Sequence, residues 1–327
     1  MIIPVLLLVL GFALLIKGGD WFVDGASGIA RRFRLPEILI GATVVSIGTT
    51  LPEVMVSAGA ALQGSGSIAY GNAIGSIICN TSLIAAITIA LKPGKAERKS
   101  MIVPVAFFFA AAAFYCIVAC ALGRFSRVTG FVLLGVFITY MITTVLGMKK
   151  GSSGNLDEAC HDESGIATQG GSFLKDVVLL VAGAVLIAFG ADFLVDNAII
   201  IAKEFGVSEK VIGLTIVALG TSLPELVTAI TSLIKGHGSL SLGNIIGANL
   251  FNLVLVSGAA VAINPFHLPV SGLIGGINSS LVIDIPVMLC VMGILTIPTL
   301  IKQKLSRWQG ILLLAIYAAF CVIQFTI

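Results

Sequence analysis

Charged residues are scarce in this chain of 327 residues: Asp, Glu, Lys and Arg make up only 11% of it, hydrophobic residues make up 57%, and the mean hydropathy is +1.10. A soluble domain carries about 25% charged residues because its solvated surface needs them. This chain therefore has too few charged residues to form the polar surface of a water-soluble protein. A basic stripe is also lacking, although Lys and Arg outnumber Asp and Glu by 19 to 16, so nothing indicates a nucleic-acid partner.

Paired cysteines are lacking as well. The chain has six cysteines without any CxxC spacing: Cys79, Cys116, Cys120, Cys160, Cys290 and Cys321. Five of them fall in apolar stretches, which predicts small buried side chains rather than disulfides or a metal site. The N-terminal segment has neither the basic start nor the small-residue cleavage site of a signal peptide, so we expect a first membrane helix there.

Long apolar stretches are what the sequence has in abundance. About ten of them reach the roughly 20 residues that a helix needs to cross a hydrocarbon core of about 30 Å. We therefore expect an all-α polytopic membrane protein with ten transmembrane helices embedded in a lipid bilayer. The expected spans are 1–17, 37–62, 68–91, 102–122, 128–147, 174–201, 210–234, 240–262, 280–301 and 308–326.

Lys and Arg are distributed unevenly between the two sets of loops. With the N-terminus outside, fifteen of the nineteen fall on the inner side, and the outer side holds only Arg124, Arg127, Lys203 and Lys210. The positive-inside rule then predicts a multi-pass protein of the cell membrane with both termini outside and the central loop in the cytoplasm. That loop is rich in Gly and Ser, as a flexible linker would be. The acidic run Asp157–Glu163 has two interpretations, a regulatory cation site and a solvated linker, and the composition favours the linker.

An internal repeat divides the chain into two halves. GATVVSIGTTLPE at 41–53 returns as GLTIVALGTSLPE at 213–225, and GNAIGSIICN at 71–80 returns as GNIIGANLFN at 243–252, both at an offset of 172 residues. We predict a first five-helix repeat at 1–147 with its motif at 41–80, a cytoplasmic linker at 148–173, and a second five-helix repeat at 174–327 with its motif at 213–252. Because five is odd, the two repeats cross the membrane in opposite directions, as they do in secondary transporters with a midplane site.

Two glutamates lie where a membrane protein can least accommodate charge. Glu53 and Glu225 are repeat-equivalent and fall near the middle of their spans. A charge at the bilayer centre costs at least a few kcal/mol by insertion scales, so it indicates a functional site. A structural ion pair is the alternative, but no Lys, Arg or His falls at that depth in any expected span. The two carboxylates are therefore expected to need a cation or protons.

The residues before each glutamate are suited to exposing oxygen atoms. Pro52 and Pro224 remove a backbone donor, which predicts kinked or unwound helix at Ser46–Thr50 and at Ala218–Ser222. Freed carbonyls in hydrocarbon are tolerated only where they line a cavity or bind something. Hydroxyls stand beside them on Thr49, Thr50, Thr221 and Ser222. A proline kink satisfied by these hydroxyls is the plainer alternative, but it does not explain the adjoining carboxylates.

The third and eighth spans carry amides near their centres, Asn80 and Asn252, which need a hydrogen-bond partner or a ligand at that depth. Asn72 and Asn244 have the same need, whereas Asn249 has no repeat partner and is expected to bridge helices. The pairs Gly71–Gly75 and Gly243–Gly247 predict close helix approach. Carboxylates, amides, hydroxyls and carbonyls are hard donors, so the set favours Ca²⁺ or Na⁺ over Zn²⁺ or Cu⁺.

The two motifs resemble the internal repeats of the Ca²⁺/cation antiporter superfamily, and in particular those of prokaryotic sodium/calcium exchangers. The resemblance covers nearly the whole chain. It implies Ca²⁺ and Na⁺ as transported ions, no organic cofactor, and alternating access in which the helices at 1–17 and 174–201 slide across the rest. It also implies a ligand set by position: Glu53, Glu225, Asn80, Asn252, Thr49, Thr50, Thr221, Ser222, the carbonyls of Ser46 and Ala218, and the Ser76 hydroxyl.

The chain departs from that family at two positions. Many sodium/calcium exchangers have an acidic residue where this chain has Asn252, and a serine where it has Ala248. The loss of a carboxylate and a hydroxyl leaves the number of Na⁺ ions per cycle open. Because the acidic residue is linked to K⁺ use in potassium-dependent relatives, its absence argues for independence of K⁺.

The leading hypothesis is a Na⁺-driven Ca²⁺ antiporter with no obligate protein partner. A proton-coupled Ca²⁺ antiporter is the nearest alternative, and the hydroxyl-rich segments GTT and GTS favour Na⁺ over it. A cation channel would place ligands from several subunits around one pore, which an inverted repeat within one chain argues against. An enzyme is not expected, because no catalytic constellation accompanies the glutamates. Finally, the pairs Asp20–Asp24 and Asp192–Asp196 fit either cation-attracting vestibules or solvated helix ends.

Overall fold

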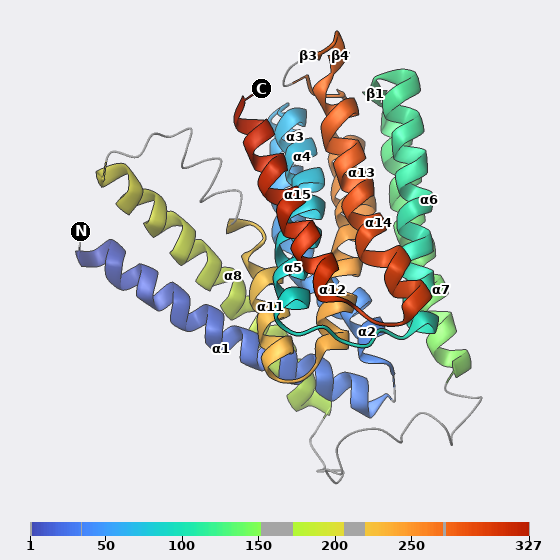
Figure 1. Cartoon of the computed structure of the whole chain (residues 1–327). Helices are drawn as coiled ribbons and strands as arrows, with labels where there is room; N and C mark the ends of the chain where they lie inside the picture. Colours follow the sequence, from blue (N-terminus) through green and yellow to red (C-terminus); the bar gives the residue numbers. More distant parts are fainter. Residues whose placement is uncertain (1, 34, 152–172, 206–219, 271–272, 327) are drawn as a thin grey trace.

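The computed structural model describes residues 2–33, 35–151, 173–205, 220–270 and 273–326, and these are almost entirely helical (Figure 1). Within these ranges, nine helices are long and apolar enough to cross a membrane. Helix α11 (Leu223–Ile234) is the described part of the expected seventh span, whose residues 210–219 lie outside the described ranges. The all-α polytopic fold that hydropathy predicts is confirmed.

The first half begins with α1 (Ile2–Arg32). Its second span consists of α2 (Glu37–Ile40), a π-helical turn η1 (Gly41–Val45) and α3 (Ser46–Leu62). Its third span consists of α4 (Gly66–Cys79), the π-helical turn η2 (Asn80–Ala85) and α5 (Ala86–Leu91). The half ends with α6 (Arg98–Leu122) and α7 (Arg127–Gly151).

The second half has α8 (Phe173–Glu204), α11 and a long span made of α12 (Gly238–Phe251), the π-helical turn η4 (Asn252–Val256) and α13 (Ser257–Ile263). It ends with η5 (Ser280–Asp284), α14 (Ile285–Lys302) and α15 (Arg307–Thr326). Strand β1 (Arg124–Phe125) pairs antiparallel with β2 (Phe266–His267), and β3 (Leu273–Ile274) pairs antiparallel with β4 (Ile277–Asn278).

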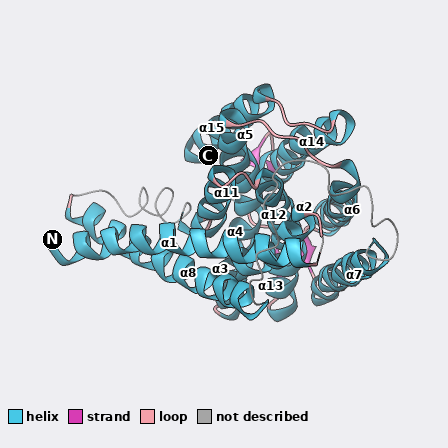
Figure 2. Cartoon of the chain, turned by 90° about the horizontal axis from the view of Figure 1, so that it is seen from below, coloured by secondary structure: helices cyan, strands magenta, loops and turns pink. Residues whose placement is uncertain are grey.

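Helices α1 and α8 lie side by side and run obliquely to the rest of the bundle (Figures 1 and 2). The expected span 1–17 is wrong, because α1 continues through Asp20 and Asp24 to Arg32. The charges that interrupt the hydropathy pattern sit on the helix and do not end it. At 1.5 Å per residue its 31 residues extend about 46 Å, which exceeds the hydrocarbon core.

Glycines bring α1 and α8 into backbone contact. A Cβ on Gly11 would lie 2.8 Å from the Leu194 nitrogen, and one on Gly18 would lie 2.8 Å from the Ile187 nitrogen. Real Cβ atoms do not approach backbone so closely, so only glycine fits there. The early part of α1 thus meets the late part of α8. The two repeat-equivalent helices are antiparallel, in agreement with the inverted repeat.

The remaining helices pack around the span formed by α12, η4 and α13. The most apolar stretch of this span is 83% buried, against 22% for α1 and for α8. Its surroundings include a core cluster with Tyr115, Tyr140 and Phe251, all of them fully buried. This burial places Asn252 at the centre of the molecule. The five cysteines in the described ranges are free thiols, and Cys160 lies outside those ranges.

Candidate cation-binding site

The two glutamates lie in the interior on helices of opposite repeats. Glu53 is in the middle of α3, and Glu225 is in the first turn of α11, where Pro224 occupies a position that needs no backbone donor. Both are 0% exposed, and neither carboxylate has a hydrogen-bond partner in the described part of the chain. Helices α3 and α11 contact each other, which brings the two carboxylates into the same region of the interior. Two adjoining buried carboxylates without partners are the chemistry of a cation site.

Asn80 and Asn252 each open a π-helical turn, η2 and η4, at repeat-equivalent positions. Both are 0% exposed, and the amide oxygen and nitrogen of each have no partner among the described residues. Single π turns inside helices occur often at functional sites. Helix α3 contacts η4, and α11 contacts η2, so each glutamate helix packs against the asparagine turn of the other repeat. The predicted carboxylates and amides therefore converge.

The predicted hydroxyl donors differ in their surroundings. Those of Thr50 and Ser222 are buried without a partner in the described ranges. The Thr49 hydroxyl donates to Asn244 Oδ1 at 3.2 Å. Ser76 is 4% exposed on α4, and Thr221 lies in the turn before α11. Ala218, predicted as a carbonyl ligand, lies outside the described residues.

The widened backbone lies one turn earlier than predicted in the first repeat. Residues Ser46–Thr50 belong to α3, so an unwound segment there is wrong; the π turn is η1, at Gly41–Val45. The Ser46 hydroxyl donates a hydrogen bond to the Gly41 carbonyl at 2.7 Å, and the Ser257 hydroxyl donates one to the Asn252 carbonyl at 3.1 Å. A hydroxyl five residues on thus satisfies the carbonyl that opens each of these turns. In the second repeat, Thr221 and Ser222 form a turn directly before α11, within the segment where the sequence predicts disturbed helix.

A network of two asparagines supports the first-repeat donors. Asn244 Oδ1 accepts a hydrogen bond from the Thr49 hydroxyl at 3.2 Å and lies 3.3 Å from the Ser46 hydroxyl, whose one proton is donated to the Gly41 carbonyl. Asn72 donates to the Glu53 carbonyl at 3.1 Å and to the Ser57 hydroxyl at 2.8 Å. Sequence reasoning identified both amides as needing partners, but it did not identify Ser57 or the contacts across the repeats. The repeat offset relates equivalent residues and carries no information about which ones touch.

The predictions for the small residues and for Asn249 have different outcomes. Gly243 approaches the Ile38 backbone and Gly247 the Ala42 backbone, which confirms close packing of α12 on the second span. Outside their own helix, no described atom lies within 4 Å of a Cβ on Gly71 or Gly75, so the close helix approach predicted at this pair is wrong. Asn249 donates to Thr81 Oγ1 at 2.7 Å, which confirms it as a bridge between helices.

We predict that Asn244→Ala weakens ion binding without unfolding the protein. Removing the Asn244 amide leaves the Thr49 hydroxyl without its acceptor, and a buried polar group left unpaired costs about 1–3 kcal/mol. The expected result is a rise of about tenfold in the Kd for Ca²⁺, measured by calorimetry on the purified protein. Asn249→Ala is the matched control, because its partner Thr81 is not among the predicted ligands. This control is expected to lower the Tm and to leave the Kd unchanged, and an equal effect of both variants on the Kd would contradict the supporting role of Asn244.

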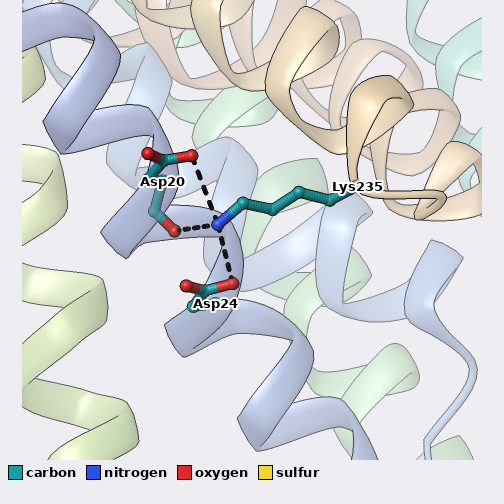
Figure 3. Close-up of polar contacts among 3 residues, drawn as sticks. All are labelled: Asp20, Asp24 and Lys235. Atoms are coloured by element: carbon teal, nitrogen blue, oxygen red, sulfur yellow. Dashed lines mark hydrogen bonds and ion pairs between the residues drawn. The ribbon is translucent and has the colours of Figure 1, made fainter.

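A cavity of about 510 Å³ adjoins the site between α1, α3, α8 and α11. Its lining includes Thr49 and Thr221 and, on α8, Asp192 and Asp196. The other acidic pair on the oblique helices, Asp20 and Asp24, is bound by Lys235 (Figure 3). The two acidic pairs therefore differ in their surroundings, although they occupy equivalent positions in the two repeats.

The chain is similar to known proteins over almost its whole length. The sequence model of a family described as "Sodium/calcium exchanger protein" matches residues 3–146 and 175–326. The uncharacterized membrane protein MJ0091 of Methanocaldococcus jannaschii is 36% identical, over 94% of this chain and 93% of that protein. The sodium/calcium exchanger MaX1 of Methanosarcina acetivorans is 34% identical, over 98% of both. A solved structure of the sodium-calcium exchanger NCX_Mj, soaked with Na⁺ and Sr²⁺, has a TM-score of 0.78 at 34% identity, covering 97% of each chain.

Proposed function

Since the chain belongs to the sodium/calcium exchanger family and is a membrane transporter rather than an enzyme, we propose that it exchanges Na⁺ for Ca²⁺ by alternating access. The exchange takes place at the buried site around Glu53 and Glu225. Its substrates are the two ions, and it needs no organic cofactor. The name of the relative MaX1 specifies the same pair of ions.

The observation that carries this proposal is the pair of fully buried carboxylates without partners. Two fixed negative charges in the interior are stabilised when one Ca²⁺, or monovalent cations, lie between them. The empty, doubly charged site is penalised in a low-dielectric interior, so a conformational exchange between the two sides is favoured only in the loaded forms. That penalty couples the movement of one ion to the return of the other.

The proposed ligands are shared by position. Glu53 and Glu225 are the central ligands, with Asn80 and Asn252 beside them as neutral oxygen donors. Flexible coordination by six to eight oxygens suits Ca²⁺. The remaining proposed donors are the hydroxyls or carbonyls of Thr49, Thr50, Thr221 and Ser222, the carbonyls of Ser46 and Ala218, and the hydroxyl of Ser76. Asn252 and Ala248 leave the second half with fewer hard donors than many family members have.

The proposed orientation follows the distribution of basic residues. Fifteen of the nineteen lie at the end that holds the central loop, which is therefore assigned to the cytoplasm of a cell membrane. Both termini are then outside. The repeats occupy residues 1–147 and 174–327, joined by the linker 148–173.

The decisive experiment is Ca²⁺ uptake by proteoliposomes that hold the purified protein. Vesicles loaded with Na⁺ and diluted into Na⁺-free buffer are expected to take up ⁴⁵Ca²⁺, because outward Na⁺ flow drives inward Ca²⁺ flow. Choline-loaded vesicles without a pH gradient serve as the control and are expected to remain at background. Equal uptake by choline-loaded vesicles with a pH gradient would instead assign proton exchange, and uptake independent of any internal cation would indicate a channel.

A further inference from the structure

Lys235 joins the long helix α1 to α11 at one end of the bundle. It is the C-terminal cap residue of α11. Its Nζ lies 2.8 Å from Asp24 Oδ1 and 3.3 Å from Asp20 Oδ1, and it donates a hydrogen bond to the Asp20 carbonyl at 2.9 Å (Figure 3). One lysine thus binds two carboxylates and a backbone oxygen on two successive turns of α1. A charged donor with three acceptors holds the two helices in a single register.

The helix interface beside Lys235 is closed. A Cβ on Gly19 would lie 2.7 Å from Val227 Cγ1 and 2.8 Å from Thr231 Oγ1, so α1 and α11 touch without space between them. Gly19 is buried in this contact. At the Lys235 end, therefore, α1 packs directly against the helix that carries Glu225.

The repeat-equivalent interface at the other end is open. The residue 172 positions after Gly19 is Ala191, and the residue 172 positions before Val227 is Met55; both line the cavity of about 510 Å³. The equivalent of Lys235 is Gln63, which likewise caps its helix, α3. Within the described residues, the Gln63 side chain makes no hydrogen bond, and Asp192 and Asp196 form no ion pair. Among the described residues, a lysine bound to the acidic pair is thus found at the closed end.

The α1–α8 pair is suited to move as a unit against the bundle. Its two helices contact each other through backbone at the glycines, whereas their most apolar stretches are only 22% buried. The pair also projects away from the other helices (Figure 2). A unit with firm internal contacts and little burial elsewhere shifts without unfolding, so a few contacts at its ends decide which position is favoured.

We propose that Lys235 is a positioning residue that sets the sidedness of exchange: by binding Asp20 and Asp24 it holds the cytoplasmic side closed, and the neutral Gln63 leaves the outer side free to open. The inference rests on the proposed function for its alternating-access cycle and on the proposed orientation for the names of the two sides. The preference for one side originates in a single charge, that of Lys235 in the second repeat, because the first repeat has the neutral Gln63 at the equivalent position.

The test measures access to each side without measuring transport. Single cysteines at the equivalent positions, Val227→Cys and Met55→Cys, are placed in a background without native cysteines. The protein is held in lipid nanodiscs, which expose both faces, and labelled with a membrane-impermeant maleimide. With Lys235 present, M55C is expected to react fast and V227C slowly. K235Q, which introduces the residue of the other repeat, is expected to raise the V227C rate and lower the M55C rate, each by about three- to tenfold.

Two further variants separate charge from structure. K235R keeps a cation and is expected to restore the original labelling ratio. Q63K places a cation at the position of α3 that is equivalent to Lys235, and it is expected to slow labelling of M55C by drawing Asp192 and Asp196 toward α3. V227C labelling that is the same with Lys235 and K235Q, or that rises equally in K235R, would overturn the inference. Because labelling needs no ion flux, a chain that failed to exchange Na⁺ for Ca²⁺ would refute the proposed function and leave this measurement interpretable.

Discussion

Glu53→Gln and Glu225→Gln are each expected to abolish Na⁺-driven Ca²⁺ uptake, with a loss of at least about 100-fold. Each glutamine keeps the shape of the side chain and removes one of the two charges that a divalent ion requires. Each substitution removes one of the carboxylates that would face the bound cation, and breaking a buried pair of opposite charges costs about 3–5 kcal/mol, which corresponds to roughly two to four orders of magnitude. The measurement is initial-rate ⁴⁵Ca²⁺ uptake at saturating and limiting Ca²⁺, combined with Ca²⁺ binding by calorimetry.

The same substitutions are expected to leave the fold intact. A neutral amide is less costly at the bilayer centre than a carboxylate, so the Tm without ions should stay the same or rise. Glu97→Gln is the matched control, because this glutamate is exposed and accepts a hydrogen bond from Ser100 at 2.8 Å in a loop. It should transport normally. Normal exchange by either E53Q or E225Q would show that the ion site lies elsewhere.

Gly18→Ala is expected to disrupt the contact between α1 and α8 and to reduce exchange by at least about tenfold. The new Cβ would lie 2.8 Å from the Ile187 nitrogen and 2.9 Å from the Gly183 carbonyl oxygen, both on backbone that cannot rotate away. Overpacking of this kind costs about 1–3 kcal/mol even where neighbours adjust. Thermal unfolding in nanodiscs should show a lower Tm, and uptake should fall because the two helices no longer move together.

Gly135→Ala provides the control for that substitution. Gly135 lies within α7, is exposed on the helix surface, and has no described atom within 4 Å of a Cβ. Alanine there should leave transport unchanged and favour the helix slightly. If G18A behaved like G135A, the backbone contact between α1 and α8 would not matter for stability or exchange.

Several features of the fold and site followed from the sequence because they depend on composition and on the repeat. Hydropathy predicts most spans to within a few residues. The 172-residue offset identifies Glu53 and Glu225 as equivalents, and the structure buries both without partners. The central amides Asn80 and Asn252 were predictable for the same reason. Their role as ligands remains a proposal, to which the convergence of the four residues lends support.

Other features were not predictable because they depend on which residues meet across the repeats. The prolines indicate disturbed helix, but the π turn in the first repeat lies at Gly41–Val45, where close contact with Gly243 and Gly247 shapes the backbone. In the sequence, Lys235 is simply one of the basic residues that fall in the loops of the inner side. Its pairing with Asp20 and Asp24 emerges only when α1 proves to be a helix well beyond residue 17.

The length of α1 has a consequence for the lipid that surrounds the protein. Of its length of about 46 Å, only the uncharged part Ile2–Ile16 is apolar throughout, and that part is about 22 Å long. A hydrophobic stretch shorter than a core of about 30 Å is accommodated by local thinning of the bilayer or by flanking charged residues that reach the interface. Lys17, Asp20 and Asp24 follow directly on this stretch. We therefore expect the bilayer beside α1 to be thinner than the bilayer around the rest of the bundle.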